Sequence, residues 1–116
     1  MAVSIIDHAT FQQLEETTDA EFVSELVDTY CEETPRLIAD LQQALRRGDA
    51  ETFRRSAHSI KSSSASFGAL DFAAQARELE MIGKAGDLTG AAAQVARLSR
   101  AYQQVEHALR ELQHGA

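Results

Sequence analysis

The stretch Ala57-His58-Ser59-Ile60-Lys61-Ser62-Ser63-Ser64-Ala65-Ser66-Phe67-Gly68 decides how this 116-residue chain folds. With Phe53 just upstream, its apolar and small side chains recur every three or four residues, a spacing that predicts one buried stripe along a helix ending near Gly68. His58 lies one step off that stripe. Residues three and four positions away are its neighbours on a helix, namely Arg54, Arg55, Lys61 and Ser62. An imidazole placed there, among cations and hydroxyls, could hold a phosphoryl group.

Amphipathic helices are also predicted upstream of this segment. Asp7 can cap a short helix to about Glu16, with Ile5-Ile6 as an apolar anchor before it. Thr18 or Asp19 can cap a long second helix that Gly48 ends, and Asp49 can cap the helix that carries His58. The apolar stripe expected on the long helix comprises Phe22, Leu26, Tyr30, Leu37, Leu41 and Leu45, widened by Val23 and Val27.

Pro35 lies inside the long helical pattern. Proline removes one backbone hydrogen bond and clashes one turn back, so the helix could be kinked or could restart with Thr34 as a cap. The apolar phase is the same on both sides of Pro35, which favours a single kinked helix.

Downstream, a fourth helix is predicted from about Leu70 to Ala85, ended by Gly86. Asp87 is then expected to cap a fifth helix, whose stripe runs from Leu88 to Leu112. Strand patterns and repeats are absent from the sequence, and the loops are short. We therefore predict one all-α domain over residues 1–116, an antiparallel up-and-down four-helix bundle with a short extra N-terminal helix.

Composition limits the possible partners. A net charge of −7 argues against general binding of nucleic acid, and no apolar run reaches the ~20 residues that span a bilayer. The single cysteine, Cys31, and the lack of a signal-peptide pattern favour the cytoplasm. Nothing in the sequence requires more than a monomer.

The segment 46–61 is basic although the whole chain is acidic. It carries five cations and two acids, so it is either a solvated helix face or a docking patch for an acidic partner.

The central stretch resembles the motif of histidine-containing phosphotransfer (HPt) domains, roughly His-x-Leu-Lys-Gly-Ser-Ser/Ala-x-x-x-Gly. The later Leu70…Leu79-Glu80 and the upstream pattern from Phe22 to His58 are also similar to that family. The resemblance implies a free-standing phosphorelay protein. His58 would accept a phosphoryl group from a receiver-domain aspartate of a hybrid sensor histidine kinase and pass it to a response-regulator receiver domain.

Three residues carry the predicted chemistry. Histidine is a nucleophile that can hold a phosphoryl group on nitrogen, and Lys61 could neutralise the phosphoryl oxygens. His58 lies ten residues before Gly68 and Glu80 lies ten residues after Leu70, so antiparallel helices would bring the two side by side. Glu80 could then accept a hydrogen bond from one ring nitrogen and fix the tautomer. The alternative is a surface acid paired with Arg77 or Lys84.

Ser62 departs from the family motif, which usually has glycine at this position. We expect this departure to affect the choice of partner or the rate of transfer more than the ability to transfer. We expect Arg54, Arg55, Ser62 and Ala65 to contact the partner, and Ser63, Ser64 and Ser66 to serve in packing. The protein should need no cofactor or metal of its own, because the receiver partner would supply the divalent metal.

Rival functions fit less well. A histidine kinase needs a glycine-rich phosphate loop, which is absent, and a di-metal bundle needs Glu-x-x-His twice, whereas it occurs once, at Glu111…His114. A helical adaptor that binds receiver domains or other partners without being phosphorylated remains the alternative. His8, His107 and His114 are expected to be surface residues, and Cys31 a small core residue.

Overall fold

The computed structural model describes residues 5–114, which form five α-helices and no strand. Their bounds are α1 His8–Thr17, α2 Ala20–Arg47, α3 Ala50–Ser66, α4 Leu70–Ala85 and α5 Ala92–Gln113. The all-helical prediction is therefore confirmed for the described part of the chain.

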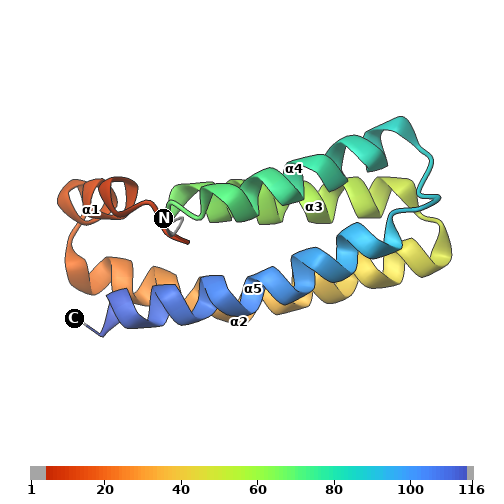
Figure 1. Cartoon of the computed structure of the whole chain (residues 1–116). Helices are drawn as coiled ribbons and strands as arrows, with labels where there is room; N and C mark the ends of the chain where they lie inside the picture. The colour runs from red at the N-terminus through yellow and green to blue at the C-terminus, as the bar shows by residue number, and fades with distance from the viewer. Residues whose placement is uncertain (1–4, 115–116) are drawn as a thin grey trace.

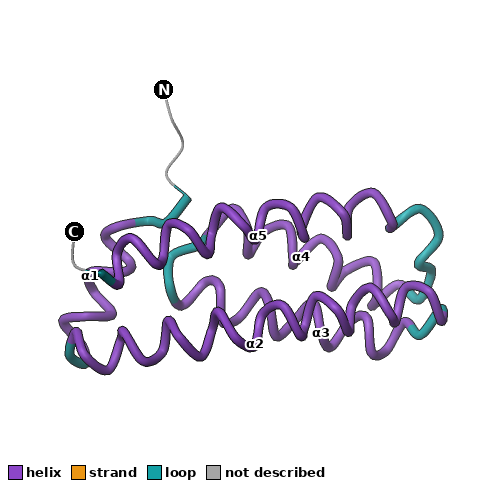
Figure 2. Tube along the Cα trace, turned by 90° about the horizontal axis from the view of Figure 1, so that it is seen from below, coloured by secondary structure: helices purple, strands orange, loops and turns teal. Residues whose placement is uncertain are grey.

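The four longer helices share one long axis (Figure 1). Helices α3 and α4 lie together above α2 and α5, and the chain reverses direction at each connection between them. Helix α2 contacts both α3 and α5, and α4 contacts the same two helices. Figure 2 shows the same four helices from below, with α1 at the end where α2 begins and α5 finishes. Helix α1 contacts α2 and α3 there.

Three aspartates begin helices as predicted. The carboxylates of Asp7, Asp19 and Asp49 each accept a hydrogen bond from the backbone N–H three residues later, which satisfies a donor that the first helical turn leaves free. Gly48 and Gly86 end α2 and α4 in the left-handed conformation, at φ 68° and 86°. Side chains with a Cβ rarely adopt that conformation, so the glycines account for both helix ends.

Helix α2 continues through Pro35 without a break, which confirms a single helix over a split one. Proline has no N–H, so the carbonyl of Cys31, one turn earlier, lacks its usual helical donor. The hydroxyl of Tyr102 on α5 donates to that carbonyl at 3.4 Å. A side chain from the neighbouring helix thus provides a replacement donor.

The interior stripe of α3 is as predicted, since Phe53, Ala57, Ile60, Ser64 and Phe67 are all buried. The stripe of α2 is only partly as predicted, because Val23, Val27, Tyr30 and Leu41 are buried but Phe22 is 46% exposed. The other predicted members, Leu26, Leu37 and Leu45, are partly buried. Since α2 packs against α3 and α5 at once, its inward direction lies between the two neighbours.

The start of the fifth helix was also predicted wrongly. Helix α5 begins at Ala92, not after Asp87. The carboxylate of Asp87 instead accepts from the N–H of Thr89, two residues on, which closes a local turn. Gly90, at φ 84°, separates that turn from the helix. An aspartate can stabilise either a turn or a helix start, and the local sequence does not distinguish them.

Candidate functional site

His58 lies near the middle of α3 with its ring at the protein surface. The side chain is 53% exposed, whereas its neighbours on the stripe, Ala57 and Ile60, are fully buried. One step of 100° around the helix therefore moves a side chain from the core to the edge of the packed face. About half of the side chain is therefore accessible to a partner protein.

Glu80 on α4 lies directly beside this ring. Its Oε2 atom is 2.7 Å from Nδ1 of His58. A carboxylate only accepts hydrogen bonds, so Nδ1 carries the proton and donates it to Glu80. Within residues 5–114 no hydrogen bond involves Nε2, the other ring nitrogen. In this tautomer Nε2 has a lone pair and is the nucleophilic atom.

Lys61 contacts the same carboxylate. Its Nζ atom is 2.7 Å from Oε1 of Glu80, so the two oxygens of Glu80 engage a lysine and a histidine from α3. The hydrogen bond from Lys61, and secondarily that from His58, holds the pKa of Glu80 below its ordinary value of 4.5. Glu80 is therefore ionised at neutral pH. The ion pairs of the described residues link it to Lys61 and His58, and to neither Arg77 nor Lys84.

The four residues expected to contact a partner lie on α3 on either side of His58. Ser62 and Ala65, one and two turns beyond it, are exposed. Arg54 and Arg55 both contact Glu51, with N–O distances of 2.6 and 3.8 Å. One acid thus partly neutralises two of the cations that make this segment basic.

Sequence reasoning missed Gly83, which lies one turn beyond Glu80 on α4. Gly83 is buried, and a Cβ added there would lie 2.9 Å from the Cα, Cβ and N atoms of Arg54. The two helices thus approach closely one turn from the His58–Glu80 pair. A signal was present in the sequence, because a glycine inside a helical pattern is unfavourable and usually has a packing reason.

Of the three serines expected to serve in packing, Ser64 alone is buried, whereas Ser63 is half-buried and Ser66 is exposed. The hydroxyl of Ser64 is fully buried and lies 2.7 Å from the hydroxyl of Tyr30 on α2. Ser63 and Ser66 donate to backbone carbonyls one turn earlier in their own helix. Ser64 therefore provides a polar contact between two helices. Burial of the Tyr30 hydroxyl raises its pKa to about 12.

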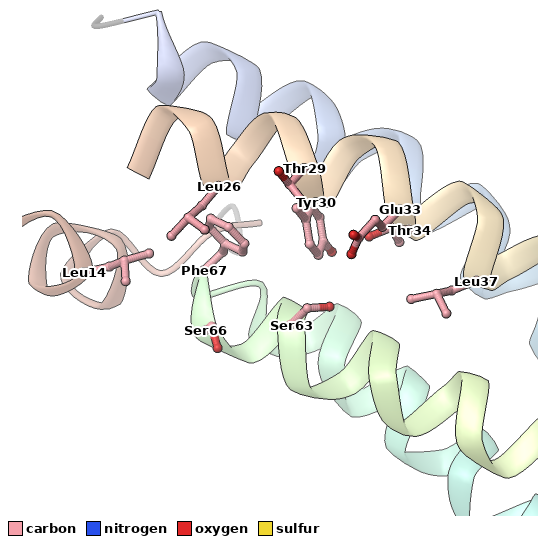
Figure 3. A pocket seen from close by; sticks show the side chains of 10 residues that line it. All are labelled: Leu14, Leu26, Thr29, Tyr30, Glu33, Thr34, Leu37, Ser63, Ser66 and Phe67. Carbon is pink, nitrogen blue, oxygen red and sulfur yellow. The ribbon is translucent and has the colours of Figure 1, made fainter. Parts of the chain in front are cut away.

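A largely apolar pocket of about 360 Å³ flanks this part of α3 (Figure 3). It opens between α2 and α3 near the end of α1. Phe67 and Leu26 lie at one end and Leu37 at the other, and Ser63 is between them on the α3 side. The remaining lining residues are Leu14, Thr29, Tyr30, Glu33, Thr34 and Ser66. The pocket lies on the side of α3 that faces α2, whereas His58 meets Glu80 on the side that faces α4.

Residues 5–114 contain no group of three or more His, Cys, Asp or Glu side chains arranged to hold a metal ion. His107 pairs with Glu111 at 2.6 Å on the exposed side of α5. Cys31 is buried, and burial raises the pKa of its thiol. None of the helices in the described part of the chain is long and apolar enough to cross a membrane.

Comparison with known proteins identifies the family of this fold. The crystal structure of histidine-containing phosphotransfer protein B (HptB) from Pseudomonas aeruginosa PAO1 is similar, with a TM-score of 0.90, 27% sequence identity and 99% coverage of each chain. A search of curated proteins finds no match. The family model of the Hpt domain matches residues 25–113, which is more than half of the sequence. The chain therefore belongs to the Hpt domain family.

Proposed function

We propose that this protein carries a phosphoryl group on Nε2 of His58 between the receiver domains of a multistep phosphorelay. The observation that carries the proposal is the half-exposed imidazole whose Nδ1 donates to Glu80. Family membership and the similarity to HptB support a role as a phosphoryl carrier. The donor would be a receiver-domain aspartate of a hybrid sensor histidine kinase, and the acceptor a response-regulator receiver domain.

Phosphoryl transfer to His58 needs no reactant besides the phosphorylated aspartate and the imidazole. The lone pair of Nε2 attacks phosphorus, the N–P bond forms, and the bond between phosphorus and the aspartate oxygen breaks, which releases the aspartate as a carboxylate. The proton on Nδ1 stays in place, so the ring becomes positively charged. The ionised Glu80 at 2.7 Å stabilises that charge as it develops. Passing the phosphoryl group to a second aspartate reverses these events.

Lys61 is assigned to the phosphoryl oxygens. Its ammonium lies one helical turn from His58, and the side chain is 31% exposed, so it can approach a group on Nε2 while remaining near Glu80. A lysine acts there as a point charge, which suits phosphoryl transfer because that reaction depends mainly on positioning and charge stabilisation.

The partner surface would surround His58. Arg54, Arg55, Ser62 and Ala65 would meet the rim of the receiver active site, and the receiver would supply its own divalent metal. The hydroxyl of Ser62 replaces the usual glycine at the point of approach, so it would influence which receivers fit.

We also propose that residues 1–116 act as one monomeric domain in the cytoplasm. The interpretation of α2–α5 as an antiparallel up-and-down bundle, with α1 as the short extra helix, is supported by the contacts of α2 and α4 with both α3 and α5. The chain reversals between consecutive helices support it as well.

The first test is intact mass after treatment with phosphoramidate, a small donor that phosphorylates histidine. We expect one acid-labile, base-stable adduct on the wild type and on the control His107→Gln, and none on His58→Gln. An adduct retained in His58→Gln would overturn the site. The second test is transfer from a phosphorylated receiver domain. Binding of receivers without any transfer, and without an adduct, would identify a helical adaptor instead.

A further inference from the structure

We propose that Gly83 is a positioning residue for His58, because it sets the separation of α3 and α4 at which Glu80 reaches the imidazole. The chemical consequence rests on the proposed phosphoryl transfer, whereas the geometric claim about the ring tautomer does not. Gly83 touches neither the ring nor the site of transfer, so it would act through Glu80.

The contact between the two helices at Gly83 is tight. A Cβ at this position would lie 2.9 Å from three atoms of Arg54, two of which belong to the backbone. Carbon atoms in van der Waals contact are separated by about 3.5–4.0 Å, so an added methyl group cannot be accommodated without movement. Backbone atoms of a helix cannot move aside as the end of a flexible side chain can. An alanine would therefore push α4 away from α3.

That displacement would act directly on the site. Gly83 lies three residues after Glu80, and Arg54 lies four residues before His58, so the close contact and the hydrogen bond are neighbours along one helix–helix seam. The 2.7 Å distance between Oε2 and Nδ1 leaves little margin, since an N–H···O bond weakens beyond about 3.2 Å. Separation of the helices by less than 1 Å is enough to lengthen this hydrogen bond beyond its normal range.

The alternative, that Gly83 reflects local helix preference, is contradicted by its conformation. Gly83 is not among the glycines with positive φ, so any residue could adopt its backbone angles. Alanine is also the better helix former at an interior position. The close approach to Arg54 is thus the feature of this position that requires glycine.

The experiment measures the ring tautomer and the phosphorylation rate separately. The variant is Gly83→Ala, and the control is Ala74→Ser, which also adds one heavy atom but at an exposed position of the same helix. The ¹⁵N chemical shifts of the His58 ring report the tautomer without any phosphorylation. The rate is the appearance of the adduct with phosphoramidate, followed by intact mass.

We expect Gly83→Ala to convert the single Nδ1–H tautomer into a mixture and to slow phosphorylation three- to tenfold, while Ala74→Ser leaves both unchanged. In a Glu80→Ala background, Gly83→Ala should have no further effect on the tautomer, because it acts through Glu80. An unchanged tautomer in folded Gly83→Ala would overturn the proposal. If wild type takes no phosphoryl group, the proposed function fails while the tautomer measurement still decides the role of Gly83.

A second variant covers the case in which Gly83→Ala does not fold. Glu80→Asp shortens the acidic side chain by one methylene and leaves the helix contact at Gly83 unchanged. If the separation of α3 and α4 limits the reach of the carboxylate, Glu80→Asp must also lose the single tautomer. Retention of the wild-type tautomer in Glu80→Asp would show that reach is not limiting, and the proposal would be wrong.

Discussion

Removing the Glu80 carboxylate tests the chemistry of the site most directly. In Glu80→Ala the Nδ1–H group of His58 loses its acceptor, and Lys61 loses its anionic partner. The Glu80 side chain is 15% exposed, but both groups that lose their partner are accessible to water, at 53% for His58 and 31% for Lys61, so the fold should persist. The ring can then adopt either tautomer, and a fraction of molecules carries the proton on the nitrogen that must attack.

The size of the effect follows from the contacts. A hydrogen bond to a charged group contributes about 1.5–3 kcal/mol, but His58 is half exposed, so water competes and we take about 1–2 kcal/mol. Since each 1.36 kcal/mol corresponds to a factor of ten in rate, phosphorylation should slow by about five- to thirtyfold. Glu80→Gln keeps an acceptor oxygen while losing the charge, and should fall between this variant and wild type.

The assay is the initial rate of adduct formation with phosphoramidate, measured by intact mass on wild type, Glu80→Ala and Glu80→Gln under the same conditions. Urea unfolding of each variant verifies that the comparison is between folded proteins. If the rate for Glu80→Ala lies within twofold of wild type, the carboxylate does not stabilise the charged ring, and the role assigned to Glu80 is refuted.

Further predictions concern the neighbouring groups. His58→Gln should keep the helical circular dichroism and thermal stability of wild type while losing all transfer from a phosphorylated receiver; residual transfer would place the carrier elsewhere. Lys61→Ala should slow that transfer or shorten the lifetime of the adduct, and unchanged kinetics would leave the lysine with only its ion pair to Glu80. Tyr30→Phe leaves the hydroxyl of Ser64 buried without its partner, so urea unfolding should show a loss of about 1–2 kcal/mol, and a neutral result would mean that water replaces the contact. Because the pKa of Glu80 is lowered on folding, its contribution to stability is complete above its unfolded value of 4.5 and is lost as pH falls through the lower folded pKa; a Glu80 carboxyl ¹³C titration at or above 4.5 would contradict this.

Much of the fold could be predicted from the sequence because helix starts and helix ends depend on residues that are close together in the chain. Helix starts at Asp7, Asp19 and Asp49 follow from a carboxylate that can reach backbone N–H groups three residues away. The position of Glu80 beside His58 was also accessible, since equal distances from one turn bring two residues of neighbouring helices to the same level.

Other features depended on which helices are neighbours. The exposure of Phe22 could not be predicted from its spacing, because the inward direction of α2 is set jointly by α3 and α5. The turn at Asp87 was mistaken for a helix start, because an aspartate caps either structure equally well. The donor that Tyr102 provides to the Cys31 carbonyl joins residues that are far apart in sequence.

The sequence by itself determined an all-helical chain and a histidine at the edge of a packed helix face, since three- and four-residue spacing is a property of one helix alone. The tertiary structure decided that a single carboxylate engages both His58 and Lys61, and that Gly83 lets α4 approach Arg54 closely enough for this to happen. The distance between two helices depends on the side chains of both, so it cannot be predicted from the residue spacing within one helix.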